Sequence, residues 1–154
     1  MFCLALGGLL LSSACGSSQI KTARGNMSLW ADAIGPPEHA ELLYEDSGIA
    51  RPDRWGCWAV WMDRVYGTGD PNEAVLTHYD QSLGDSEEWV RNANIVSDDS
   101  AVYDHPDGTS IHISTDIAYD FPEQVEKYQA LYKTLFYVVI TARPAEVRER
   151  CREY

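Results

Sequence analysis

The segment that most restricts the fold is 57–66, CWAVWMDRVY, because apolar residues occupy successive positions at its start. Neighbouring side chains of a strand point to opposite faces, so such a segment presents apolar surface on both. A surface strand would instead alternate apolar and polar residues. We therefore predict a central strand that is covered on at least one side and ends at Gly67.

Two amphipathic helices are predicted after this strand, each with a recognisable start. Residues 70–84 begin with Asp70 as the expected N-cap, and one face of the helix then carries Val75, Tyr79 and Leu83. The second helix is expected to begin at Asp120, where Pro122 fits the first turn. Its inward-facing positions are Val125, Tyr128, Tyr132 and Leu135.

The other predicted elements are a hairpin, a final strand and two short helices. The hairpin pairs 101–103 with 109–113 around the turn sequence HPDG at 105–108, and the final strand covers 136–141. The short helices are expected at 38–44 and 145–153.

This order of elements predicts an α+β fold. Strand, helix, hairpin, helix and strand in succession form the βαββαβ pattern of the ferredoxin-like split unit, here with an extra short helix at each end. The alternative is a β-α-β-β-β antiparallel sheet packed by helices, in which 88–96 forms a strand.

The N-terminal residues carry a separate signal. Residues 2–11 are a short apolar run, about half the length of a membrane-spanning helix, and small residues at 12–14 precede Cys15. This pattern resembles the lipobox of bacterial lipoproteins. The combination of a tether and a small domain rich in Trp and Asp is similar to uncharacterised secreted lipoproteins of actinobacterial type. The resemblance implies a signal peptide over 1–14 and a lipid, diacylglycerol with palmitate-like chains, on Cys15. The first basic residue is Lys21, so we expect the true start codon further upstream.

The resemblance also implies a location and an organisation. We expect a protein anchored by lipid on the extracytoplasmic face of the cell membrane. Cys15 and a flexible tether would cover 15–35, and a single α+β domain would cover 36–154. The chain has a formal net charge of −12, and such a surface repels nucleic acid, so no nucleic-acid partner is predicted.

Two cysteines remain once Cys3 is removed and Cys15 is lipidated. Cys57 and Cys151 are therefore predicted to form a disulfide in an oxidising compartment. Two isolated cysteines are too few for a structural zinc site.

Searches for other chemistry leave few candidates. Asp104 and Asp107 are candidates for a calcium site, but their spacing does not fit an EF-hand and no metal is predicted. The aromatic residues with possible ligand contacts are Trp55, Trp61 and Tyr66, although core packing is the simpler role for them. His112 is expected on a strand face opposite Ile111, as a surface or partly buried residue.

These observations favour a non-catalytic binding or interaction module at the cell envelope, with an envelope protein, a small molecule or a saccharide as partner. No catalytic residue and no cofactor is predicted. The alternatives are a small hydrolase, whose Asp and His within 104–116 would come together only in the fold, and a structural accessory of a membrane complex.

Overall fold

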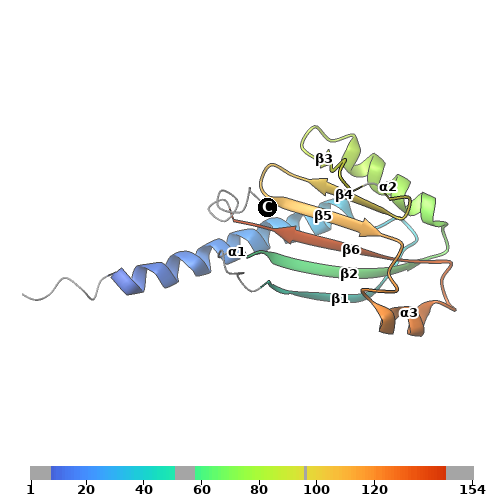
Figure 1. Cartoon of the computed structure of the whole chain (residues 1–154), viewed down its shortest axis with the longest axis horizontal. Helices are drawn as coiled ribbons and strands as arrows, with labels where there is room; N and C mark the ends of the chain where they lie inside the picture. Colours follow the sequence, from blue (N-terminus) through green and yellow to red (C-terminus); the bar gives the residue numbers. More distant parts are fainter. Residues whose placement is uncertain (1–7, 51–57, 96, 145–154) are drawn as a thin grey trace, which may run out of the picture.

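The computed structural model describes residues 8–50, 58–95 and 97–144, with side chains from residue 19 onward. It contains one antiparallel sheet of six strands in the order β1-β2-β6-β5-β4-β3 (Figure 1). The strands are β1 (Glu41–Ile49), β2 (Val60–Thr68), β3 (Val90–Arg91), β4 (Ser100–Asp104), β5 (Thr109–Ser114) and β6 (Thr134–Ala142). The predicted α+β class is confirmed.

The order of the strands departs from the ferredoxin-like arrangement. The last strand lies antiparallel beside the strand predicted at 57–66, which is β2. However, β6 also pairs with β5 and so lies inside the sheet, whereas the ferredoxin-like unit places its last strand at an edge. The reason is that β6 is apolar on both faces and gains most from an interior position. The alternative β-α-β-β-β order fits in one respect, because β3 lies within the strand that it places at 88–96.

Two helices cover one face of the sheet. They are α1 (Gly8–Ile34), which lies against β2 and β6, and α2 (Asn72–Gly84), which lies against β3 and β4. Figure 1 shows α1 crossing this face and extending beyond the sheet at its N-terminal end. The main hydrophobic core fills the space between these helices and the sheet. The side chains predicted on the inner face of α2 are buried, namely Val75, Tyr79 and Leu83.

Two predictions for the N-terminal region are wrong. Residues predicted as a tether belong to α1, because Ala23, Met27 and Ala31 recur every four residues and form a buried stripe on the core. The packed unit therefore begins before residue 36. Within the helix predicted at 38–44, residues 41–44 instead begin β1, which pairs with β2 and forms one edge of the sheet.

The helix boundaries also differ from those predicted. The N-cap of α2 is Pro71, and the Asp70 carboxylate instead accepts a hydrogen bond from the Thr68 hydroxyl at 3.2 Å. The second predicted helix is α3 (Pro122–Tyr128), which begins after Phe121 and ends well before β6. The β4–β5 hairpin is confirmed, and Gly108 in its turn has a φ of 89° that favours glycine.

Several predictions concern residues outside the described part of the chain. These are Cys3, Trp55, Cys57, Cys151 and the helix at 145–153. In the part that is described, no helix has the length and apolar character needed to cross a membrane.

Candidate functional site

The face of the sheet opposite α1 and α2 carries a regular array of side chains. The strand register places Asp46, Asp63, Val139 and His112 in one row across β1, β2, β6 and β5. A neighbouring row contains Tyr44, Val65 and Tyr137. This second row is covered by a small apolar cluster to which Ile117, Phe121 and Val125 contribute.

A hollow of about 480 Å³ lies where the covered row meets the row that contains Asp63. We call it the sheet hollow. Its lining comes from three strands and from the segment that leads into α3: Asp63, His112, Asp120, Phe121, Tyr137 and Val139. The Tyr137 ring lies 5.3 Å from the Phe121 ring and 5.3 Å from the His112 ring, between centroids, so aromatic packing holds this lining in place.

The electrostatics of the sheet hollow favour ligands with a positive charge. Burial, together with the nearby carboxylates of Asp46 and Asp120, raises the pKa of Asp63 to about 6. Burial lowers the pKa of His112, although Asp120 acts in the opposite direction. Burial and Asp120 raise the pKa of Tyr137 to about 12. At pH 7 the lining is therefore anionic, and Tyr137 remains a neutral hydroxyl.

Asp63 and His112 face each other across the hollow. Each is aligned with Val139, on either side of β6, so their backbones are about 10 Å apart at the usual strand spacing. A ligand can contact both side chains at once. Among the described residues, no group of three or more His, Cys, Asp or Glu side chains could hold a metal ion.

The residues predicted from the sequence are not brought together. The predicted aromatic contacts Trp61 and Tyr66 lie on opposite faces, because Trp61 aligns with Gly48 beside the Asp63 row, whereas Tyr66 is buried in the main core. The metal candidate Asp104 accepts hydrogen bonds from Ser110 at 2.6 Å and Asn92 at 3.0 Å. The carboxylate of Asp107 is used elsewhere, in contacts with α1.

Asp107 joins the hairpin turn to α1. The Trp30 Nε1–H donates to Asp107 Oδ2 at 3.0 Å, and the Thr109 backbone N–H donates to Asp107 Oδ1 at 2.7 Å. His105 Nδ1 lies 3.0 Å from Asp107 Oδ1, and its ring packs against the rings of Trp30 and Trp89 at 4.7 and 5.0 Å. We call this set of five residues the Trp30–Asp107 clip.

The clip contains the kind of His–carboxylate pair that the hydrolase alternative requires within 104–116. However, only 11% of the His105 side chain is exposed, and the two indole rings occupy the space beside it. A substrate has no room to reach His105 in this arrangement. The contacts of the pair therefore indicate a structural link between α1 and the hairpin.

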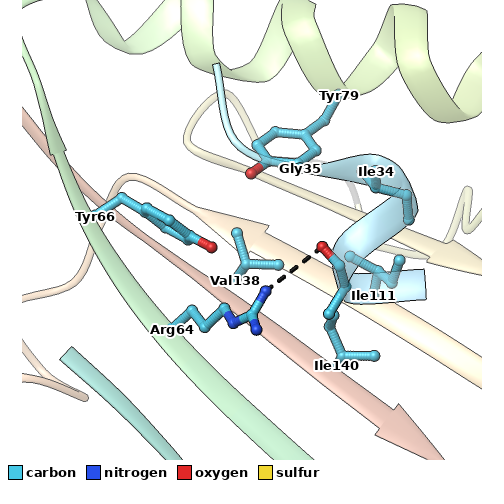
Figure 2. Close-up of a pocket in the computed structure, with 9 residues that line it drawn as sticks. Ile34, Gly35, Arg64, Tyr66, Tyr79, Ile111, Val138 and Ile140 are labelled. Atoms are coloured by element: carbon cyan, nitrogen blue, oxygen red, sulfur yellow. Dashed lines mark hydrogen bonds between the residues drawn. The ribbon is translucent and has the colours of Figure 1, made fainter. Parts of the chain in front are cut away.

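A second cavity lies under the C-terminal end of α1 (Figure 2). Figure 2 shows the hydroxyl groups of Tyr66 and Tyr79 directed into it, and Arg64 donating to the Ala31 carbonyl at 3.4 Å. Arg64 also pairs with Glu45 at 2.6 Å. The volume of this second cavity, about 10 Å³, is close to that of a single water, so the cavity is too small for an organic ligand.

The lining of the sheet hollow was not predicted, although its residues carry a partial signal. Asp63 occurs within the apolar strand, and His112 was expected on the face opposite Ile111. Alternation assigns each residue to a face, but only the pairing of β2 and β5 with β6 brings them into one row.

No known protein family, no curated protein and no solved structure matches the chain.

Proposed function

We propose that this protein is a lipid-anchored, extracytoplasmic binding module whose ligand occupies the sheet hollow. The observation that carries the proposal is the hollow itself, which combines apolar and aromatic contacts with Asp63, Asp120 and His112 on several of its sides. Binding sites commonly have this mixture of apolar lining and a few polar groups that orient the ligand.

The separation of Asp63 and His112 supports binding over hydrolysis. Residues that exchange a proton directly lie within hydrogen-bond distance, or one water apart, whereas these two stand on either side of β6. The His–carboxylate pair of the clip is packed between indole rings. Neither arrangement supplies an accessible base next to a nucleophile.

The anchor in this proposal is the lipid on Cys15. Its support is the resemblance of the N-terminal residues to a lipobox. The test is mass spectrometry of the membrane-extracted protein from the native cell. We expect an N-terminal diacylated Cys15, and Cys15→Ser should abolish the modification and release the domain from the membrane fraction. An unprocessed, unlipidated N-terminus would refute the anchor.

The binding role is tested by a fragment screen monitored by NMR on the full chain in detergent. We expect hits that shift the backbone amides of Asp63, His112 and Val139 in a saturable way. Fragments that shift only amides remote from these residues, or no fragment binding at all, would refute the hollow as the ligand site. Hydrolysis of a fragment during the titration would favour the enzyme alternative instead.

A further inference from the structure

The charge balance of the sheet hollow limits what can bind there. Asp63 and Asp120 line it, Asp46 lies beside Asp63 in the same row, and none of the described lining residues is Lys or Arg. The one lining group that can become cationic is His112, whose pKa is lowered by burial. An anionic ligand would meet repulsion from two sides of the hollow.

The Asp63 carboxylate is destabilised by its surroundings. It is half-buried on β2, and no hydrogen bond or ion pair from the described residues reaches it. Burial and the neighbouring carboxylates both disfavour its charged form, and for this reason its pKa is raised. A positive charge placed beside it would offset both costs, which is the behaviour of a carboxylate that pairs with a ligand.

The geometry distinguishes an organic cation from a metal ion. A metal needs several ligands around one point, and no described group of three or more His, Cys, Asp or Glu side chains could hold one. The hollow instead spans about 480 Å³ and has Phe121, Tyr137 and Val139 in its lining. Aromatic rings also attract organic cations through their faces.

We propose that the sheet hollow binds an organic cation, an ammonium or guanidinium group attached to an apolar body. The charged group lies between Asp63 and Asp120, and the apolar body packs on Phe121, Tyr137 and Val139. This proposal rests on the proposed function, because it names the class of ligand for the same site.

Acid weakens this binding. The groups that face Asp63 are Asp46 and Tyr44 from β1, His112 from β5, Tyr137 from β6 and Asp120 from the segment before α3. As the pH falls through about 6, Asp63 becomes protonated and its attraction for a cation is lost. Protonation of His112 acts in the same direction, because it adds a positive charge to the lining. The affinity for a cation should therefore be greater at pH 7.5 than at pH 5.

The test compares two probes of the same shape and different charge. Phenethylammonium and its neutral counterpart 2-phenylethanol are titrated into the full chain in detergent at pH 7.5 and pH 5, and amide shifts of Asp63, His112 and Val139 are followed. At pH 7.5 we expect the cation to bind roughly tenfold more tightly than the alcohol, the ratio given by about 1.4 kcal/mol. At pH 5 the preference for the cation should be smaller, because Asp63 is then largely protonated.

Two substitutions locate the charge, and one controls for the overall acidity of the protein. Asp63→Asn and Asp120→Asn should each weaken phenethylammonium binding about fivefold or more and leave 2-phenylethanol unchanged. Asp98→Asn removes an exposed carboxylate that does not line the hollow and should change neither. Asp120 is exposed, so its substitution tests the site even if the Asp63 variant folds poorly.

Each other outcome overturns the proposal in a recognisable way. Equal binding of the two probes at the hollow would show a site without preference for a cation, so the binding role would stand and the ligand class would fail. Binding of phenethylammonium that Asp98→Asn weakens as much as Asp63→Asn would show general attraction to an acidic surface. If neither probe shifts the hollow and the fragment screen also finds nothing there, the proposed function fails as well.

Discussion

Replacing Asp107 by Asn should destabilise the protein at neutral pH and remove part of its sensitivity to acid. Burial opposes the ionised form of Asp107, but hydrogen bonds from Trp30, Thr109 and His105 outweigh that effect and lower its pKa from 3.8 to about 2. A carboxylate whose pKa is lower in the folded chain contributes stability above its ordinary pKa. That contribution is lost as the pH falls from about 4 towards 2.

The size of the effect follows from the two pKa values. Their difference is about 1.8, and each unit corresponds to 1.36 kcal/mol, so the ceiling is about 2.4 kcal/mol. The Asp107 side chain is 26% exposed, and solvent screens part of its interactions. We therefore expect Asp107→Asn to lower the free energy of unfolding by about 1–2 kcal/mol at pH 7.

The assay is urea denaturation of the two proteins at pH 7, 4, 3 and 2. At pH 7 the free energy of unfolding of Asp107→Asn should be lower than that of the parent protein. This difference should shrink as the pH falls below 4. Asp98→Asn, an exposed carboxylate outside the clip, should follow the parent protein at every pH. A gap that stays constant from pH 7 to pH 2, or no gap at pH 7, would refute the explanation of the clip.

Three further perturbations test the packing. Trp30→Phe keeps an aromatic ring but removes the N–H donor, so it should raise the pKa of Asp107 as read by carbon-13 NMR titration; an unchanged titration would contradict the hydrogen bond. Gly67→Ala would place a Cβ about 2.5 Å from the Tyr132 ring and should cost about 1–3 kcal/mol in urea denaturation, whereas Gly69→Ala meets no atom within 4 Å and should cost less. Leu83 is 1% exposed, so Leu83→Ala should lower the free energy of unfolding by about 2–5 kcal/mol. Leu131 is 71% exposed, so Leu131→Ala should lower it by under about 1 kcal/mol. Similar losses for the two variants would contradict the placement of the core.

The predictions that succeeded rest on short-range patterns. The inner face of α2 is read from apolar residues that recur every four positions, and the β4–β5 hairpin from a turn sequence between two apolar runs. The predictions fail where pairing between residues far apart in sequence determines the structure. The sequence of residues 41–44 fits a helix as well as a strand. These residues form part of β1 because they pair with β2. Likewise, the sheet hollow exists only because β6 lies between β2 and β5.

The aspartates show the same limit at the level of single residues. Asp104 and Asp107 are neighbours in sequence, yet one bonds to Ser110 and Asn92 and the other to Trp30 on α1. Asp63 and Asp120 are far apart in sequence and line one hollow. Proximity along the chain was therefore a poor guide to which carboxylates share a site.

The continuity of α1 has a consequence for a domain anchored at Cys15, as we propose. Ala23, the first residue of the buried stripe, follows Cys15 by eight positions of the same helix, a rise of about 12 Å. A flexible segment of that length would reach a similar distance but would let the domain tumble in every direction. A continuous helix instead fixes the direction of the sheet relative to Cys15, so the hollow would keep a constant distance from the lipidated residue whatever the angle between the helix and the bilayer. Ligands would then reach the hollow at a fixed distance from the anchor point, with tilt and rotation of the whole rigid unit as the remaining freedom.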